Sequence, residues 1–112
     1  MKGLFLDDER NPEDVTWIKY PCEIVWDIVR THAEFEKALI HNSYDFVSLD
    51  HDIQDFTEEY KELTGYTCLL TMINFVMDDG MSLPRLFVHS QNPVGAENIR
   101  QHYNNYLKFL EI

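Results

Sequence analysis

Acidic and histidine side chains follow three of the four short apolar runs in this sequence. They are Asp7, Asp8 and Glu9 after residues 3–6, Asp50, His51 and Asp52 after residues 46–49, and His89 with Ser90 after residues 85–88. Five carboxylates in one crevice repel one another unless some are protonated or a cation lies among them. Oxygen ligands favour Mg²⁺, Mn²⁺ or Ca²⁺, and the nearby histidines leave Mn²⁺ or Zn²⁺ open. If the segments converge, they predict a divalent-cation site, for Mg²⁺ or Mn²⁺ first, with the candidate ligands Asp7, Asp8, Asp50 and Asp52.

Groups that bind or protonate an oxyanion lie in or beside the same segments. His51 and His89 exchange protons near neutral pH, so they are candidate catalytic residues together with Asp50. Arg10 can hold a phosphoryl oxygen through two N–H groups, and the amide groups at the start of a predicted helix would face an anion. The candidate phosphate- or substrate-binding residues are Arg10, Ser90, Asn92, Gly95 and Asn98. This combination is typical of phosphoryl transfer or phosphodiester chemistry.

Each of these residues also has a structural interpretation. Acids after a strand often cap helices or form solvated loops, and a single histidine at a strand end is often structural. Arg10 could simply neutralise its acidic neighbours, and Asn92-Pro93 could be only a turn and a helix start. The coincidence of Asp7, Asp50 and His89 at equivalent strand ends favours a functional site.

The elements that must position these residues alternate between short apolar runs and amphipathic runs. The candidate strands are 3–6, 23–29, 46–49 and 85–88. Helical patterns start at Asn11, ending before Pro21, and after Thr31; others cover 68–77 and follow Pro93. This βα alternation predicts a three-layer α/β domain over residues 1–112, with a parallel sheet and helices on both faces. Ligands bind at the carboxyl ends of such strands, where the acidic segments lie. Residues 53–64, with four acids, are predicted to be a lid or binding loop.

The overall charge limits the partners of the protein. Nine Lys and Arg residues against twenty Asp and Glu give a net charge of −11, which disfavours long duplex nucleic acid and membrane surfaces. No apolar stretch approaches a membrane span, and the first residues lead into a strand and not a signal peptide. We therefore expect a cytoplasmic protein. Cys22 and Cys68 are expected to be buried thiols.

Four sequence segments occur together in a specific order: LFLDDERNP at 4–12, SLDHD at 48–52, TGY at 64–66 and VHSQNPVGA at 88–96. They resemble the cyclic-phosphate processing receiver family, a divergent branch of the response-regulator receiver fold in bacteria and phages. The resemblance covers nearly the whole chain. It implies a receiver-like, flavodoxin-like sheet truncated to about four strands in the order 2-1-3-4. It also implies action on cyclic-phosphate ends of nucleic acids in RNA repair, in the host cytoplasm if the protein is phage-encoded.

Individual residues match the motifs of an ordinary receiver domain. Asp7 and Asp8 resemble its Mg²⁺-binding acid pair, Asp50 its phosphoacceptor and Ser90 its hydroxyl residue after the fourth strand. Gly65 resembles the glycine that opens the helix after the phosphoacceptor loop.

The chain also departs from that pattern. The fifth strand and its phosphate-binding lysine are missing, which argues against conventional phosphorelay. His51, Asp52 and His89 are additions that a phosphoacceptor would not need, the 50–65 connection is longer, and Thr67 replaces an expected acid.

The leading hypothesis is a metal-dependent enzyme that hydrolyses a 2′,3′-cyclic phosphate at an RNA 3′ end or on a small nucleotide. His51 and His89 would be its base and acid. Two alternatives stay open: a receiver-like signalling module, in which Asp50 accepts a phosphoryl group or the pocket senses a ligand, and an acidic interaction protein. The edge of the fourth strand could be covered in a homodimer.

Overall fold

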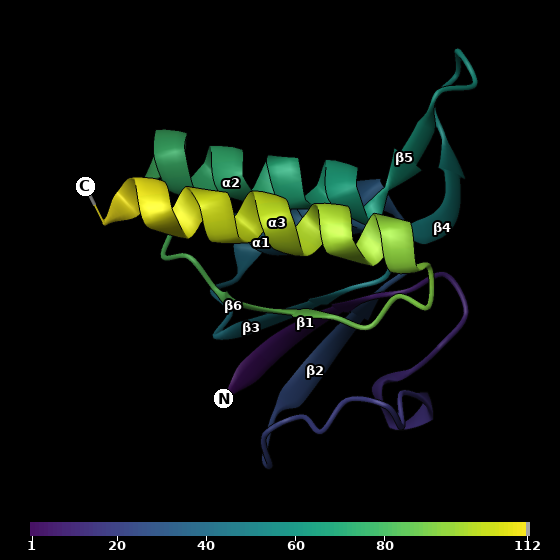
Figure 1. Ribbon diagram of the computed structural model, residues 1–112, viewed down its shortest axis with the longest axis horizontal. Helices are drawn as coiled ribbons and strands as arrows, with labels where there is room; N and C mark the ends of the chain where they lie inside the picture. The colour runs from purple at the N-terminus through teal and green to yellow at the C-terminus, as the bar shows by residue number, and fades with distance from the viewer. Residues whose placement is uncertain (112) are drawn as a thin grey trace.

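Four parallel strands form the central sheet in the computed structural model, which describes residues 1–111 (Figure 1). They are β1 (Lys2–Leu6), β2 (Val25–Val29), β3 (Phe46–Leu49) and β6 (Arg85–Val88). Their order is β2-β1-β3-β6, and every neighbouring pair is parallel. The predicted receiver-like α/β sheet, in which the first strand lies between the second and the third, is confirmed.

Three α-helices pack against one face of this sheet (Figure 1). They are α1 (His32–His41), α2 (Gly65–Asp79) and α3 (Pro93–Leu110). The side chains of Thr31, Thr64 and Asn92 cap their first turns, and Gly80 ends α2 with a positive φ of 69°. The core between sheet and helices is apolar; its fully buried members include Leu4, Leu6, Phe35, Val47, Leu49, Leu69, Met72 and Ile99.

The opposite face of the sheet is covered by the segment from residue 7 to 24 and not by an α-helix. The helix predicted after Asn11 is only a 3-10 turn, η1 (Pro12–Asp14), because the backbone becomes extended at Val15, with φ −88° and ψ 91°. Tyr20 packs edge-on against Trp26 and Phe87, with ring centroids 5.0 and 5.1 Å apart. Aromatic contacts therefore attach the covering segment to this face of the sheet.

The alternation of side chains along the strands sorts polar from apolar residues. Leu4 and Leu6 face the helices, so Phe5 and Asp7 point to the other face. The same alternation sends Ser48 and Asp50 of the β3 segment, and His89 after β6, to that face. The four buried polar or charged residues of the described chain, Asp7, Ser48, Asp50 and His89, thus share the face that the helices do not cover.

The predicted lid or binding loop at 53–64 is mostly an antiparallel hairpin. It consists of β4 (Asp52–Phe56) and β5 (Glu62–Thr64), and it projects from the body of the molecule (Figure 1). Ile53 is almost fully buried and anchors the hairpin, while the amide of Thr57 donates to the carbonyl of Lys61 to close the turn. The abundance of acids hid this strand pattern in the sequence.

Two further expectations concern the surface. Cys68 is buried, as expected, but Cys22 is exposed because it lies in the segment that crosses the open face of the sheet. No helix within residues 1–111 combines the length and the hydropathy needed to cross a membrane.

Candidate functional site

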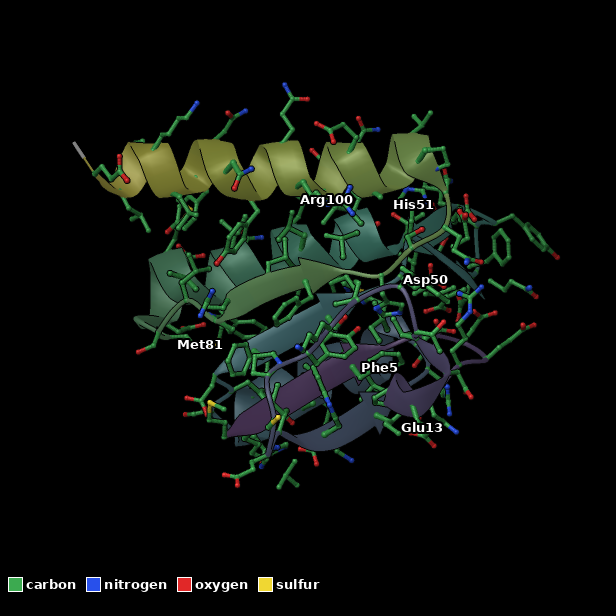
Figure 2. The ribbon with its side chains drawn as sticks, turned by 60° about the horizontal axis from the view of Figure 1, so that its bottom comes forward. Phe5, Glu13, Asp50, His51, Met81 and Arg100 are labelled. Carbon is green, nitrogen blue, oxygen red and sulfur yellow. The ribbon has the colours of Figure 1, made fainter. Side chains whose placement is uncertain are left out.

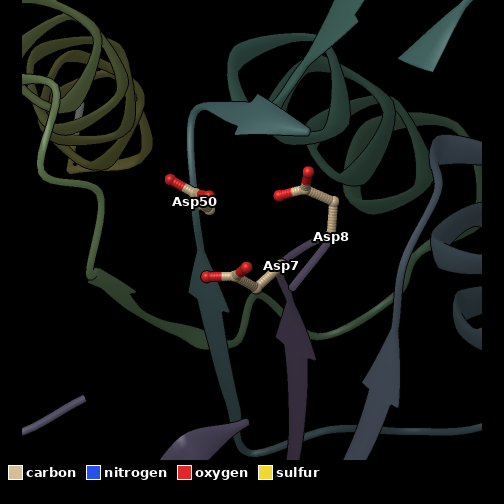
Figure 3. Close-up of side chains that lie close together, drawn as sticks. All are labelled: Asp7, Asp8 and Asp50. Atoms are coloured by element: carbon tan, nitrogen blue, oxygen red, sulfur yellow. The ribbon is translucent and has the colours of Figure 1, made fainter. Parts of the chain in front are cut away.

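The carboxylates of Asp7, Asp8 and Asp50 come together at the carboxyl ends of β1 and β3 (Figure 3). One oxygen of each lies within 4.8 Å of the other two. β1 and β3 are neighbouring parallel strands whose register pairs Leu6 with Leu49, so the residues after them emerge side by side. The predicted convergence of these two segments is present in the structure.

Asp7 is the most constrained member of this group. It is 1% exposed, and its Oδ1 accepts hydrogen bonds of 2.8 Å from the amides of Glu9 and Arg10. Its Oδ2 lies 3.1 Å from Nε2 of His89. Burial alone would raise the pKa of Asp7, but the bonds from His89 and the two amides outweigh it and hold that pKa below its usual range. Asp7 is therefore ionised at neutral pH.

Asp50 has the opposite shift. Burial, and then the charge of Asp7, raise the pKa of Asp50 above its ordinary value of 3.8, against smaller contributions from His89, the His51 amide and the Ser90 hydroxyl. A carboxylate that is costly to ionise beside another carboxylate is stabilised by a bound cation.

Gly65 allows the backbone to approach Asp50 closely. A Cβ at Gly65 would lie 1.8 Å from the carbonyl oxygen of Asp50, and the Gly65 amide donates to the carbonyl of His51 at 2.8 Å. A side chain at this position would displace the backbone that carries the carboxylate. The glycine singled out in the sequence thus fixes the start of α2 against the site.

Two arginines hold the acidic segment after β1. Arg10 places Nη1 3.4 Å from Asp7 Oδ2 and 4.0 Å from Asp50 Oδ2, and its Nη2 donates to Gln91. Arg30 donates to the backbone carbonyls of Asp7 and Arg10 at 3.0 and 2.6 Å, and to the side chain of Asn11. Sequence reasoning missed Arg30 and Gln91, because nothing in a local pattern shows that an arginine after β2 reaches carbonyl groups 23 and 20 residues away.

His89 lies beneath the site and has no exposed surface. Its ring stacks on Phe5 with centroids 4.4 Å apart, its Nδ1 lies 2.7 Å from Ser48 Oγ, and its Nε2 faces Asp7. Ser48 Oγ also lies 2.7 Å from the hydroxyl of Tyr20, whose pKa burial raises to about 12, so that this hydroxyl stays protonated. The result is a hydrogen-bonded chain from the partly buried Tyr20 through the buried Ser48 and His89 to Asp7.

His51 is placed differently, at the surface and beside α3. Figure 2 shows it near the first turn of α3, while Asp50 lies nearer the sheet. Its Nδ1 is 2.8 Å from Asp52 Oδ1, and Asp52 Oδ2 accepts a hydrogen bond from the Asn92 side chain. These bonds lower the pKa of Asp52, the one from His51 most. A Cβ at Gly95 would lie 2.4 Å from the His51 ring, so Gly95 makes room for that ring.

Not every predicted residue reaches the three carboxylates. Asp52 lies outside that group and is bound to His51 and Asn92, although it lines the same pocket. Asn92 uses its Oδ1 to accept from the Gly95 amide, so its side chain already occupies the predicted anion site at the start of α3. Asn98 lines a different groove, together with His51.

The acidic pocket has a volume of about 340 Å³. Its lining includes the five carboxylates singled out in the sequence, with Arg10, Ser90, Gln91 and Asn92 on its other walls. Oxygen ligands of an octahedral Mg²⁺ lie about 3 to 4 Å apart, which the spacing of the Asp7, Asp8 and Asp50 oxygens allows. Three carboxylates, one with its pKa raised by burial and by its neighbour, fit a hard divalent cation, and Asp7, Asp8 and Asp50 are the residues that would hold it.

Comparison with known proteins gives a match to a family model. Searches of curated proteins and of solved structures found none. The model of the cyclic-phosphate processing receiver domain matches residues 2–105, which contain all four sequence segments and every site residue described above. The chain belongs to the cyclic-phosphate processing receiver domain family.

Proposed function

We propose that this protein hydrolyses 2′,3′-cyclic phosphates, on a nucleotide or at an RNA 3′ end, with the help of a divalent cation, and that it works in RNA repair. The observation that carries the proposal is the group formed by Asp7, Asp8 and Asp50 at the strand ends of a cyclic-phosphate processing receiver domain. In the reaction, water adds to phosphorus, one bond from phosphorus to a ribose oxygen breaks, and that oxygen takes a proton. The product is a phosphomonoester.

The cation would be Mg²⁺ or Mn²⁺, held by Asp7, Asp8 and Asp50. When bound, such an ion polarises a phosphoryl oxygen and lowers the pKa of water. Asp7 supplies a carboxylate that stays ionised, because His89 and two backbone amides donate to it. The Ser90 hydroxyl lowers the pKa of Asp50 and so favours its ionised form.

His51 is the residue that we assign to proton transfer. It is partly exposed, and Asp52 fixes its ring through Nδ1, which directs Nε2 away from that bond. Asn92 in turn holds Asp52. In other catalytic histidines too, a carboxylate accepts a hydrogen bond from one ring nitrogen and so orients the other nitrogen toward the substrate.

The role that we assign to His89 differs from the catalytic one that its position in the sequence suggested. With no exposed surface and both ring nitrogens engaged, it does not meet a substrate in this structure. We propose that His89 is a positioning residue, which fixes Asp7 and keeps it ionised. Proton exchange with the substrate then rests on His51 and water.

Arg10 is the group best placed to bind the phosphate. Its guanidinium is about one-third exposed and is already in the pocket beside Asp7 and Asp50. Gln91 and the Trp17 ring hold it from the other side. A guanidinium in this position can donate two N–H groups to a phosphoryl oxygen pair.

The test is release of a monoester from a 2′,3′-cyclic mononucleotide, followed by ³¹P NMR with Mg²⁺, Mn²⁺ or EDTA. We expect turnover with the cations, none with EDTA, and a loss of at least about 100-fold in Asp50→Asn and His51→Ala, as for other removed acid–base groups. Asp79→Asn, an exposed acid at the end of α2, is the matched control and should keep full activity.

Two outcomes would contradict the proposal. Full activity in Asp50→Asn would remove the metal site from the reaction. Absence of turnover, together with phosphorylation of Asp50 by a small phosphodonor and Mg²⁺, would favour the signalling alternative.

A further inference from the structure

A second pocket lies next to the acidic one. It is an open groove of about 390 Å³ between the start of α2 and one side of α3. This volume is within the range of about 300 to 1,000 Å³ that is usual for small-molecule sites. His51 lines this groove and is hydrogen-bonded to Asp52, which lines the acidic pocket, so this pair of side chains lies between the two pockets.

The charge of the two pockets differs completely. The acidic pocket is lined by five carboxylates and Arg10, as expected for a cation and a phosphate. Among residues 1–111, no Asp, Glu, Lys or Arg side chain lines the groove, in a protein whose net charge is −11. An uncharged polar group is therefore the ligand that this groove suits.

Side-chain amides provide the hydrogen-bonding groups of the groove. Asn98, Gln101 and Asn105 follow one another at intervals of three and four residues, which places them on one side of α3. None of these three side-chain amides forms a hydrogen bond within residues 1–111, and all three residues are exposed. Asn and Gln amides pair with the donor and acceptor edges of nucleobases.

An aromatic pair forms another part of the lining. The Tyr66 hydroxyl lies 3.1 Å from Nδ1 of His102, and the two rings meet edge to face with centroids 5.4 Å apart. Their hydrogen bond fixes both rings. Tyrosine and histidine rings are common stacking partners for unpaired bases.

We infer that this groove binds the nucleobase of the nucleotide whose cyclic phosphate lies in the acidic pocket. The inference rests on the proposed function and adds a base subsite to it. His51, at the junction of the pockets, would then lie beside the ribose that joins base and phosphate. The nucleobase can belong to a free nucleotide or to the last residue of an RNA chain.

The experiment is a titration of the full chain with each of the four ribonucleosides, which carry no phosphate, followed by ¹H–¹⁵N NMR. We expect at least one nucleoside at millimolar concentration to shift the side-chain amide signals of Asn98, Gln101 and Asn105. Asn98→Ala with Gln101→Ala should weaken that binding about tenfold, which is the effect of losing one good base contact. Asn104→Ala is the matched control, because this exposed amide lies on α3 outside the groove and should leave binding unchanged.

The outcomes separate this inference from the proposed function. Absence of shifts with every nucleoside, or equal binding by the double variant, overturns the base subsite even if cyclic phosphates are hydrolysed. NMR shifts of the groove residues without any turnover support the subsite and count against hydrolysis.

Where turnover occurs, a ribose 2,3-cyclic phosphate without a base should react at least about tenfold less efficiently in kcat/KM. Comparing a cyclic mononucleotide with a short oligonucleotide of the same terminal base then identifies the source of the base.

Discussion

The two faces of the central sheet have different compositions and different tasks. The face toward α1, α2 and α3 is packed with aliphatic and aromatic side chains, and none of the four buried polar residues lies on it. The opposite face carries Asp7, Ser48, Asp50 and His89, covered by Tyr20, Trp26 and the segment after β1. Side chains of a strand alternate between faces, so one short sequence supplies both environments.

This difference separates stability from chemistry. Apolar burial on the helix face contributes most of the folding free energy, since it scales with the apolar area removed from water. The other face contains charged and polar groups that are expensive to bury unless each has a partner, and all of them have one within residues 1–111. Changes within the apolar core of the helix face should therefore alter stability alone, and changes on the other face should also alter the site.

The largest effects test this separation with two phenylalanines of equal burial. Phe35 lies in the helix-face core, and Phe5 stacks on His89; both are 0% exposed. Each Phe→Ala substitution should lower the free energy of unfolding by about 3 to 5 kcal/mol. Urea unfolding measures this loss. Only Phe5→Ala should also weaken Mn²⁺ binding, because His89 and Asp7 lose their support. Equal weakening of Mn²⁺ binding by the two substitutions would contradict the difference between the two faces.

Two glycines give the next largest effects. Gly65→Ala brings a Cβ against the Asp50 carbonyl and should lower stability by about 2 kcal/mol, with at least tenfold weaker Mn²⁺ binding. Gly80→Ala has free space but a φ of 69°, so it should lower stability by about 1 kcal/mol and leave Mn²⁺ binding unchanged. Calorimetric unfolding and Mn²⁺ titration of both variants measure the contrast. Unchanged Mn²⁺ affinity in Gly65→Ala would show that the close approach does not position Asp50.

A smaller effect concerns the metal-free protein. Because the pKa of Asp50 is raised by burial and Asp7, its ionisation opposes folding. This opposition is absent below pH 3.8, the ordinary value, and grows as the pH rises through the folded pKa. Asp50→Asn should therefore raise the stability of the metal-free protein at pH 7 by about 1 kcal/mol, or roughly 4 °C in Tm.

The same substitution should have the opposite effect when the ion is present. With saturating Mg²⁺ the wild type should be the more stable form, because only it gains the binding free energy. Thermal unfolding in EDTA and in Mg²⁺ checks both signs. A lower Tm of Asp50→Asn in EDTA would contradict the assigned repulsion between Asp7 and Asp50.

The smallest effect concerns the two thiols, one on each side of the sheet. Burial raises the pKa of Cys68, in the helix-face core, to about 12, whereas Cys22 is exposed on the segment that covers the other face. In native protein at pH 8, a thiol reagent should modify Cys22 alone, and both cysteines should react in urea. Mass spectrometry counts the modified groups. Rapid modification of Cys68 in the native state would show that the core opens locally.

Much of this arrangement was predictable from short patterns. The apolar runs predicted the four strands and the helix at 68–77, the Thr31 cap and Pro93 predicted the other two helices, and the rule that parallel strands share a carboxyl edge brought Asp7, Asp8 and Asp50 together. The burial of His89 also had a signal, since alternation from Val88 directs it away from the helices. Alternation predicts the face of the sheet toward which His89 points but not how far it is buried. Its burial depends on Phe5 and Tyr20, which are far away in sequence.

Other features needed the tertiary structure. The contact of Arg30 with backbone carbonyls and the displacement of Asp52 from the carboxylate group depend on how loops cross. The hairpin at 52–64 was missed because its exposed face carries acids where a strand pattern expects β-branched residues. The groove that contains Asn98 exists only when α3 lies beside the start of α2.

The central claim is that Asp7, Asp8 and Asp50 form a divalent-cation site and that Asp52 serves His51. Isothermal titration with Mn²⁺ tests it most directly, on the wild type and on Asp8→Asn, Asp50→Asn and Asp52→Asn. One bound ion is expected in the wild type, with at least about tenfold weaker binding in the first two variants, as for loss of a metal ligand or its support, and little change in the third. The claim would be contradicted if the wild type did not bind Mn²⁺, or if Asp8→Asn and Asp50→Asn bound it as tightly as the wild type does.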